Sequence, residues 1–220
     1  MNDSTLTRDR EAFIRAHTRL TPTPHAPSIS LHVADEATAL WEKTEEELGE
    51  MGLPPPFWAF AWAGGQALAR YILDHPETVR GKRVFDVASG SGLVAIAAAQ
   101  AGAASVIANE IDEFALAAIA LNASVNGVRI AIEAGDKIGA AADADIICAG
   151  DVFYERDMAT RIADWLSERV NAGALALVGD PGRSYLPKER LEHLASYMVP
   201  VTRALEDAEI KRASVWRFVR

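Results

Sequence analysis

Short apolar stretches alternate with helical stretches from residue 82 onwards, and this alternation limits the possible folds more than any other feature of the chain. Strands and helices that alternate at such spacing form a parallel sheet with helices on both faces. The pattern therefore predicts a doubly wound α/β fold. The expected strands are residues 84–87, 105–108, 129–132, 145–149 and 174–178, and the expected helices are residues 93–101, 113–123 and 156–170.

The end of the chain departs from this alternation. Residues 198–205 and 209–219 have the pattern of two successive strands, joined by Glu206 and Asp207. Two strands with so short a connection pair antiparallel. We therefore expect a seven-stranded sheet that is mostly parallel and that ends in a C-terminal antiparallel hairpin.

The first 56 residues follow a different pattern, so we expect an N-terminal extension over residues 1–56 and a main domain over residues 57–220. Three consecutive prolines, residues 54–56, break the chain at this boundary. Further elements are predicted from caps and breakers. They are an extended polar arm at residues 1–27, a short strand at residues 27–33, an acidic helix at residues 35–48 and a helix at about residues 62–73.

The charge balance constrains the partners of the chain. It has 22 lysine and arginine residues against 31 aspartate and glutamate residues, a formal net charge of −9. Binding to nucleic acid needs a basic face for the phosphates, so nucleic acid is not expected as the main partner. The negative charge suits a protein partner that presents lysines.

Cysteine and histidine give no sign of a metal or disulfide site. Cys148 is the single cysteine, so the chain can form neither an internal disulfide nor a cysteine zinc cluster, and its five histidines show no ligand spacing. The N-terminus lacks the apolar core of a secretory signal, and no apolar run is long enough to span a membrane. We therefore expect a soluble cytoplasmic protein with no metal and no membrane partner.

The loop after the first strand of the sheet carries the strongest sign of a ligand. It reads Asp86-Val87-Ala88-Ser89-Gly90-Ser91-Gly92, and its glycines let the backbone turn sharply and approach a ligand closely. Glu110 ends the next strand, twenty residues after Gly90. That spacing matches a carboxylate that accepts hydrogen bonds from ribose hydroxyls. The residues expected to hold a nucleoside-containing cofactor here are Asp86, Ala88, Gly90, Gly92 and Glu110.

Two classes of cofactor fit such a loop. A dinucleotide site prefers a third glycine, where this chain has Ala95, and the carboxylate of Asp86 would repel a pyrophosphate. The same carboxylate would attract the charged amino group of a methionine moiety. The motif therefore favours S-adenosylmethionine over a nicotinamide cofactor, and a nucleotide-binding oxidoreductase is kept as the alternative from another class.

Four segments of the chain carry a family resemblance. Residues 86–92 resemble motif I of the class I methyltransferases, with Ala88 where glycine is frequent, and Asp151-Val152-Phe153-Tyr154 resembles the D-x-x-Y signature of protein-lysine methyltransferases. Residues 56–65 (PFWAFAWAGG) and 179–183 (GDPGR) resemble most closely the lysine methyltransferases of the electron transfer flavoprotein beta subunit. Ribosomal-protein lysine methyltransferases, which share the motif I region in similar form, are the nearest competitor.

The resemblance covers roughly residues 30–220. It implies a Rossmann-like seven-stranded fold and S-adenosylmethionine-dependent methylation of lysine on that flavoprotein subunit or, as the alternative, on a ribosomal protein. A cofactor-binding module without catalysis is disfavoured, because both residues of the D-x-x-Y signature are retained. The resemblance also implies that Trp62 packs beside the cofactor, that Ala134, Gly135 and Asp136 border its adenine, and that Asp151 and Tyr154 face the point of methyl transfer.

Methyl transfer to lysine determines what Asp151 and Tyr154 can do. The amine must attack in its neutral form, and its usual pKa of about 10.4 means that neutralising it at pH 7 costs roughly 4–5 kcal/mol. A carboxylate stabilises the ammonium form, so the expected role of Asp151 is to dock and aim the lysine. Tyr154 can add a hydrogen bond or an aromatic face. In the structural alternative, Asp151 caps the following helix and Tyr154 lies in the core.

Four aromatic residues crowd six positions ahead of the helix at residues 62–73. They can wall a cofactor or form a cage for a methylated ammonium, or they can pack as core. We expect Trp62 at the cofactor and both Phe57 and Phe60 in the core, and Trp58 is open between the two. Asp136 also has two possible roles, as an acceptor for the adenine amino group or as a turn residue after its strand.

Overall fold

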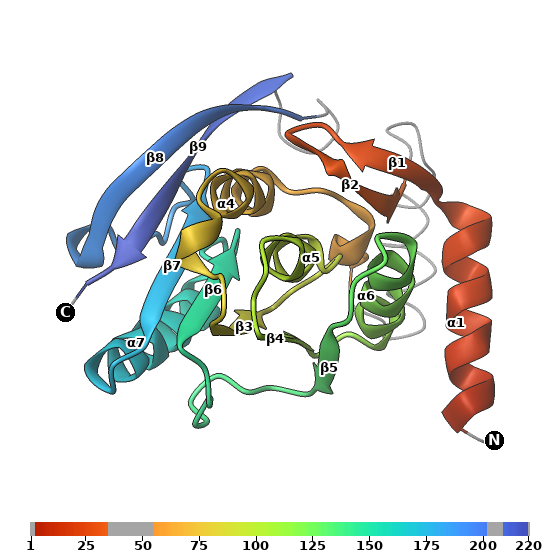
Figure 1. Ribbon diagram of the computed structural model, residues 1–220, viewed down its shortest axis with the longest axis horizontal. Coiled ribbons are helices and arrows are strands. Elements are labelled where there is room, and N and C mark those ends of the chain that lie inside the picture. The colour runs from red at the N-terminus through yellow and green to blue at the C-terminus, as the bar shows by residue number, and fades with distance from the viewer. Residues whose placement is uncertain (1–2, 35–54, 202–208, 220) are drawn as a thin grey trace.

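The computed structural model describes residues 3–34, 55–201 and 209–219. The strands of its main sheet are β3 (Arg83–Val87), β4 (Ser105–Glu110), β5 (Ala131–Ala134), β6 (Ile146–Gly150), β7 (Leu175–Asp180), β8 (Leu191–Pro200) and β9 (Ile210–Phe218). Over the described ranges these seven strands have the order β5-β4-β3-β6-β7-β9-β8 (Figure 1). Strands β3 to β7 run parallel, whereas β9 pairs antiparallel with both β7 and β8. The expected doubly wound sheet with a C-terminal hairpin is therefore confirmed.

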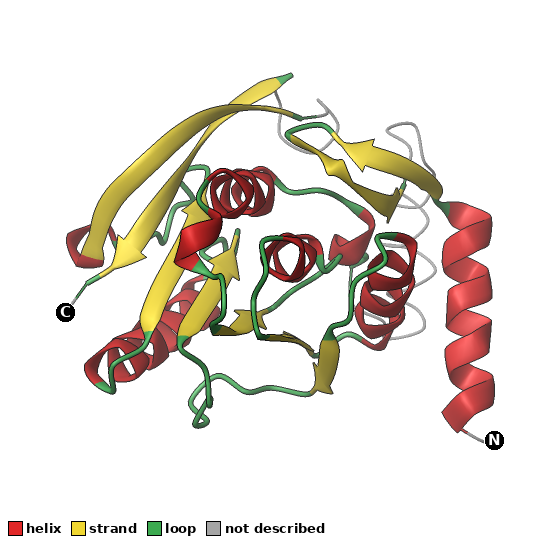
Figure 2. Ribbon diagram, in the orientation of Figure 1, coloured by secondary structure: helices red, strands yellow, loops and turns green. Residues whose placement is uncertain are grey.

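Helices cover both faces of the sheet. They are α4 (Ala63–Asp74), α5 (Leu93–Gln100) and α6 (Glu113–Val125) on one face and α7 (Arg156–Asn171) on the other (Figures 1 and 2). Successive side chains of a strand point to opposite faces. Val84 and Ile146 accordingly join the core under α4 and α5, whereas Phe85 and Ile147 join the core under α7.

The N-terminal turn of α4 rests directly on the ends of β6 and β7 through glycines. A Cβ atom built on Gly64 would lie 2.4 Å from the carbonyl oxygen of Gly179, and one built on Gly179 would lie 2.2 Å from that of Gly64. A side chain does not fit at either position, because backbone atoms on both sides leave it no room. Gly65, the next residue of α4, is different, since a Cβ atom there would first meet Leu93 at 4.0 Å.

The expected extended arm over residues 1–27 is wrong. Asp3–His17 forms a helix, α1, that packs on α6. Ile14 is fully buried among side chains of α6, and the ring of Phe13 meets the ring of Phe114 edge-on at 5.4 Å. The sequence of this helix is mostly polar, so the contact with α6 stabilises it more than its own periodicity does.

A two-stranded hairpin follows α1 and packs against α5 and α6. It consists of β1 (Arg19–Thr23) and β2 (Ala26–Val33), which pair antiparallel. The expected strand at residues 27–33 is thereby confirmed. The buried side chain of Asn122 in α6 accepts a hydrogen bond at 2.8 Å from the backbone amide of His32, which fixes β2 to α6.

The boundaries of the other described elements agree with the sequence prediction within two residues, except for β8. This strand begins at Leu191, seven residues before the expected start at residue 198. It is an edge strand with many polar or exposed positions, which hide the apolar pattern of a strand. The expected acidic helix at residues 35–48 and the expected turn at Glu206 and Asp207 lie outside the described residues.

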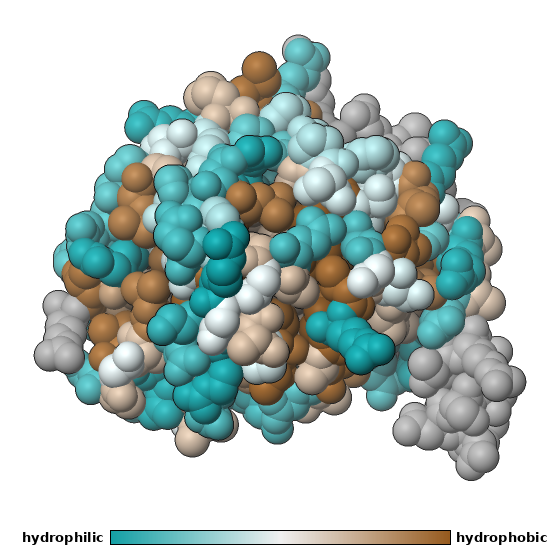
Figure 3. All heavy atoms as spheres, viewed as in Figure 1, coloured by the Kyte–Doolittle hydropathy of each residue, from teal (hydrophilic) through white to brown (hydrophobic). Residues whose placement is uncertain are grey.

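In the described ranges, buried hydrophobic side chains gather in three clusters, one under α4 and α5, one under α7 and one between α1 and α6. Cys148 of β6 is fully buried in the first of them, and burial raises the pKa of its thiol. Figure 3 shows polar side chains spread over the viewed face, with hydrophobic ones in small groups between them. No helix in the described ranges combines the length and the apolarity that crossing a membrane requires.

Candidate active site

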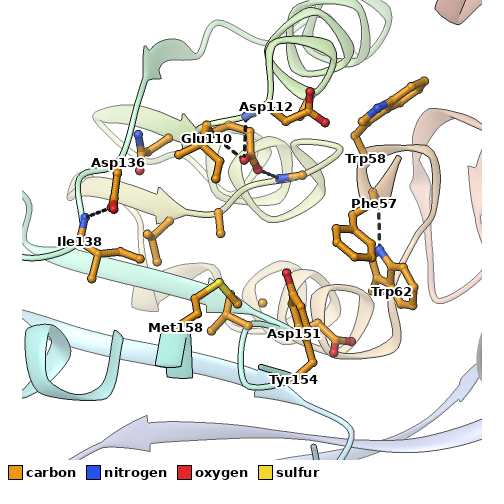
Figure 4. Close-up of a pocket in the computed structure, with 18 of the residues that line it drawn as sticks. Phe57, Trp58, Trp62, Glu110, Asp112, Asp136, Ile138, Asp151, Tyr154 and Met158 are labelled. Carbon is orange, nitrogen blue, oxygen red and sulfur yellow. Dashed lines mark hydrogen bonds between the residues drawn. The ribbon is translucent and has the colours of Figure 1, made fainter. Parts of the chain in front are cut away.

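A pocket of about 480 Å³ lies at the carboxyl ends of β3, β4 and β6. Ligands of open α/β sheets bind at these ends, and the volume is typical of a small-molecule site. Figure 4 shows Glu110 on one side of the pocket and Asp151 and Tyr154 on the opposite side. The expected site residues that line the pocket are Trp62, Ala88, Gly90, Glu110, Asp136, Asp151 and Tyr154.

The loop after β3 adopts a left-handed backbone at three positions. Ala88, Gly90 and Gly92 have φ angles of 50°, 56° and 82°. Gly90 lines the pocket, and a Cβ atom built on it would meet nothing within 4 Å, so its backbone faces open space that a ligand can enter. Gly92 instead begins α5, and a Cβ atom there would lie 3.4 Å from Ile119. Gly92 therefore serves helix packing and does not line the pocket.

Asp86 lies beneath this loop and not at the pocket wall. Its side chain accepts hydrogen bonds from the hydroxyl of Ser89 and, at 3.2 Å, from the backbone amide of Ala95. Burial raises the pKa of Asp86 to about 7, and the neighbouring charge of Glu110 contributes to the rise. Asp86 therefore holds the loop against the first turn of α5.

Glu110 ends β4 with its carboxylate fixed by backbone amides. Its Oε2 accepts a hydrogen bond from the amide of Gly90 at 2.9 Å, and its Oε1 accepts one from the amide of Ile111 at 2.7 Å. These bonds join the end of β4 to the loop after β3. Each carboxylate oxygen has two lone pairs, so Glu110 retains acceptor capacity for a ligand.

Asp112 lies on the same wall, and the sequence analysis did not anticipate it there. It caps α6, accepting a hydrogen bond from the amide of Phe114 at 2.8 Å. Burial raises the pKa of Asp112 to about 6, and the charge of Glu110 contributes. The cap is visible in the sequence as an aspartate ahead of a helix, whereas its place at the pocket depends on the three-dimensional fold.

Of the three residues expected to border an adenine, only Asp136 lines the pocket. Its Oδ1 accepts a hydrogen bond from the amide of Ile138 at 3.0 Å, and its Oδ2 is paired with Arg161 at 2.6 Å. It thus forms the turn that was one of its two expected roles, and it also faces the pocket. Ala134 and Gly135 lie behind it at the end of β5 and do not line the pocket. Ile138 and Arg161 line it as well, which the sequence analysis missed.

Aromatic rings form another wall of the pocket (Figure 4). The indole nitrogen of Trp62 donates a hydrogen bond to the carbonyl of Phe57 at 2.9 Å, and the two rings lie 5.9 Å apart. Trp58 is buried, lines the pocket and stacks on Phe114. The core position expected for Phe57 is wrong, because this residue is half-buried and lines the pocket. Phe60 is buried, as expected.

Asp151 is held on both carboxylate oxygens. Its Oδ2 accepts a hydrogen bond from the backbone amide of Gly64 at 2.8 Å, and its Oδ1 is paired with Nε of Arg183 at 2.6 Å. Its backbone is left-handed, with φ of 61°, and its amide donates to the carbonyl of Gly179 at 2.8 Å. The side chain is only 4% exposed. The carboxylate is thus an oriented part of the pocket wall, at the N-terminal end of α4.

The structural alternatives for Asp151 and Tyr154 are both wrong. The cap of α7 is Glu155, which accepts hydrogen bonds from two backbone amides of that helix. Tyr154 is 47% exposed and lines the pocket, and its ring lies 5.6 Å from that of Phe57. Partial burial raises the pKa of its hydroxyl, and the charges of Glu110 and Asp151 contribute.

Arg183 is a pocket residue whose role the sequence analysis did not assign, although it belongs to the 179–183 segment singled out there. Its guanidinium is paired with Asp151 and lies 5.8 Å from the ring centre of Trp62. Its backbone amide donates to Oδ1 of Asp180 at 2.7 Å. The pairing joins the loop after β7 to the end of β6.

No three histidine, cysteine, aspartate or glutamate side chains among residues 3–34, 55–201 and 209–219 gather as a metal ion requires. What the pocket offers are fixed carboxylates, an arginine, a tyrosine hydroxyl and aromatic faces. These groups can bind and orient a nucleoside and an amine.

Comparisons with known proteins find similar chains that are methyltransferases. Residues 67–175 match the family model described as ribosomal protein L11 methyltransferase (PrmA). The electron transfer flavoprotein beta subunit lysine methyltransferase of Xenopus laevis is 36% identical over 214 residues, which cover 94% of this chain and 86% of that protein. Its counterpart in Homo sapiens is 32% identical, covering 94% of this chain and 81% of that protein. Among solved structures, the magnesium protoporphyrin IX methyltransferase of Synechocystis PCC 6803, with bound SAH, has a TM-score of 0.51 at 14% identity over 70% of this chain and 81% of that one, a likeness of fold.

Proposed function

We propose a function from one premise, that this chain belongs to the family of electron transfer flavoprotein beta subunit lysine methyltransferases. The chain is accordingly a methyltransferase, and we infer that it transfers methyl groups from S-adenosylmethionine to lysine on an electron transfer flavoprotein beta subunit. One observation supports this most. A single pocket is lined by Gly90 and Glu110, which suit a nucleoside, and by Asp151 and Tyr154, which suit a lysine. We name these two walls the cofactor side and the acceptor side.

The residues of the cofactor side fit S-adenosylmethionine. Gly90 leaves open space for close approach of a ligand, and the carboxylate of Glu110 has lone pairs for the ribose hydroxyls. Asp136 can accept a hydrogen bond from an adenine amino group. The cofactor supplies, when bound, a methyl group on a positively charged sulfur, and the aromatic faces of Phe57 and Trp62 suit that charge.

The remaining expected cofactor residues would act indirectly in this proposal. Asp86 and Gly92 keep the loop after β3 in its left-handed form, and Ala88 completes the pocket wall beside them. Ala134 and Gly135 place Asp136 at the end of β5. Substitution of these supporting residues should therefore change the shape of the cofactor side without removing a direct contact.

On the acceptor side, the lysine amine reacts through its lone pair, so it must first lose the proton that it carries at neutral pH. The lone pair of the nitrogen forms the new bond to the methyl carbon while the carbon–sulfur bond breaks with its electron pair going to sulfur. Each methyl group gained releases one proton to water. Asp151 and Tyr154 would dock and orient the amine, and holding the reactants in place is itself a large part of such catalysis.

Methylation of a purified beta subunit tests this function. We expect label from S-adenosylmethionine with a radioactive methyl group to appear on lysine, located by mass spectrometry. The label should be lost with Glu110→Ala at low cofactor concentration. A wild-type enzyme that binds S-adenosylmethionine in calorimetry but labels no lysine of the subunit would overturn the proposal.

Ribosomal protein L11 is the second candidate substrate, because the matching family model carries its name. That match spans residues 67–175, so it includes none of Phe57, Trp62 and Arg183, which also line the pocket. The same assay with ribosomal protein L11 as acceptor separates the two candidates. A thermal-shift comparison of S-adenosylmethionine with NAD addresses the oxidoreductase alternative.

A further inference from the structure

Arg183 occupies a place at which its charge bears on any amine that enters the acceptor side. It lines the pocket beside Asp151 and Trp62, and its guanidinium touches both of them, through the 2.6 Å ion pair and the 5.8 Å ring contact. The side chain is 21% exposed and the carboxylate of Asp151 is 4% exposed. The pair is therefore well shielded from water, and charges in such a place interact more strongly than at a surface.

The loop that carries Arg183 is itself fixed. Asp180, at the end of β7, is almost fully buried, and its Oδ1 accepts hydrogen bonds from the amides of Gly182 at 2.6 Å and of Arg183 at 2.7 Å. This turn sets the direction in which Arg183 leaves the backbone. The side chain then lies between the ring of Trp62 and the carboxylate of Asp151.

The charge of Asp151 is consequently already compensated. One oxygen faces the positive end of α4 through the amide of Gly64, and the other faces Arg183. At Asp151, a lysine that enters the acceptor side thus meets a carboxylate whose charge is already compensated. The first turn of α4 adds no titratable side chain. The titratable or charged groups near Arg183 and Tyr154 include Asp151, Asp180 and Glu155, and those elsewhere in the pocket wall include Glu110, Asp112, Asp136 and Arg161.

We propose that Arg183 is a positioning residue that also governs the charge state of the substrate: it orients Asp151 and, by its fixed positive charge, favours the neutral amine of the incoming lysine. This inference rests on the proposed lysine methylation. A positive charge within about 4–6 Å lowers the pKa of an amine, whereas an uncompensated carboxylate raises it. Arg183 thus supplies what Asp151 alone cannot, a larger fraction of amine with a free lone pair near neutral pH.

The test is the pH dependence of single-turnover methylation at saturating cofactor and beta subunit, because the rate of the bound complex reports the ionisation of the bound lysine. Arg183→Gln should move the rising limb of the profile by about one unit to higher pH, so that its rate approaches the wild-type rate in alkali. Arg183→Lys, which keeps the charge, should restore most of the wild-type profile. Arg190→Gln removes an arginine from an exposed pair with Asp164 and serves as the matched control.

Asp151→Asn should shift the pH profile in the direction opposite to Arg183→Gln, so it tests the same inference if Arg183→Gln does not fold. Asp151→Asn removes the negative charge that is paired with Arg183, so its profile should move to lower pH, whatever happens to the maximal rate. A lower rate with an unshifted profile in Arg183→Gln, or an unshifted profile in Asp151→Asn, would reduce Arg183 to a structural residue and overturn the inference. A wild-type enzyme that methylates no lysine at any pH would instead overturn the proposed function, and the inference with it.

Discussion

On the cofactor side of the pocket, the carboxylate of Glu110 is held by backbone amides of two neighbouring strand ends, whereas on the acceptor side Asp151 is held by partners that lie far away in the sequence. Arg183 is 32 residues from Asp151, and Gly64 is 87 residues from it. A backbone amide is present whatever the side chain, so the cofactor side tolerates variation around its motif. The acceptor side depends on three separate segments with defined residues, and we expect it to respond more sharply to substitution.

The largest effect is expected at the contact that brings one of these distant partners to Asp151. Gly64→Ala should destabilise the fold by about 3 kcal/mol, because the added carbon would meet the backbone of Gly179 and push α4 away from the sheet. Gly65→Ala is the matched control. It should be neutral or stabilise by up to about 1 kcal/mol, since alanine is the better helix former and space is available. Chemical denaturation gives the free energy of unfolding of both variants. Equal values would show that the sheet can move enough to accommodate a side chain at position 64.

The next effect tests the cofactor side. Glu110→Ala should weaken binding of S-adenosylmethionine by roughly 1.5–3 kcal/mol, the range for hydrogen bonds to a charged group. Isothermal calorimetry gives the affinity, and circular dichroism verifies that the fold is retained. Unchanged affinity in a folded variant would remove Glu110 from the ribose site and leave it as a brace between β4 and the loop after β3.

On the acceptor side, we expect a smaller change in free energy. It should affect the rate of methyl transfer and not the binding of the cofactor. Asp151→Asn should leave cofactor affinity near normal and lower turnover at least about tenfold, which corresponds to about 1.4 kcal/mol of barrier. The reason is that the substitution weakens the pairing with Arg183 and the orientation of the lysine amine toward the methyl group. Asp164→Asn, in an exposed pair on α7, is the control. Full activity of Asp151→Asn in single-turnover methylation would move the search for the lysine-docking group elsewhere in the pocket.

The smallest effect is expected at Asp112, on the cofactor side. Asparagine caps helices about as well as aspartate, so Asp112→Asn should change stability below about pH 4, where the aspartate is protonated, by less than about 1 kcal/mol. Burial raises the pKa of Asp112 to about 6 in the folded state. Its favourable contribution to stability is therefore complete below about pH 4 and is lost as the pH rises through 6. The stability of the wild type relative to the variant should fall across that window in thermal unfolding, and a constant difference would contradict the raised pKa.

The difference between the two sides also explains which parts of the fold and of the site could be predicted from the sequence. The alternation of strands and helices and the Gly90–Glu110 spacing are local patterns, so they predicted the sheet and placed Gly90 and Glu110 at the pocket. Arg183 and Asp112 could not be assigned in the same way, because their positions depend on which strand ends become neighbours. The expected contact of Asp86 with a ligand remains a prediction, and the structure places this residue beneath the loop.

Tertiary contacts overrode local composition elsewhere. Residues 3–17 are mostly polar and were predicted to be extended, yet burial of Ile14 on α6 is enough to order a helix. Phe57 looks like a core residue by its type, but its ring faces Tyr154 across the pocket wall. In both cases the decisive partner lies more than 90 residues away in the sequence, beyond the reach of any local pattern.

The glycine contact under α4 has a genetic consequence. Gly64 and Gly179 already carry the smallest possible side chain, and what they meet in each other is backbone. A larger residue at either position therefore has no neighbour that could shrink in compensation. In a suppressor selection that begins with Gly64→Ala, revertants should restore glycine at the original codon, and second-site suppressors at the contact should be absent. Both positions should therefore remain glycine in any variant of the chain that keeps this fold.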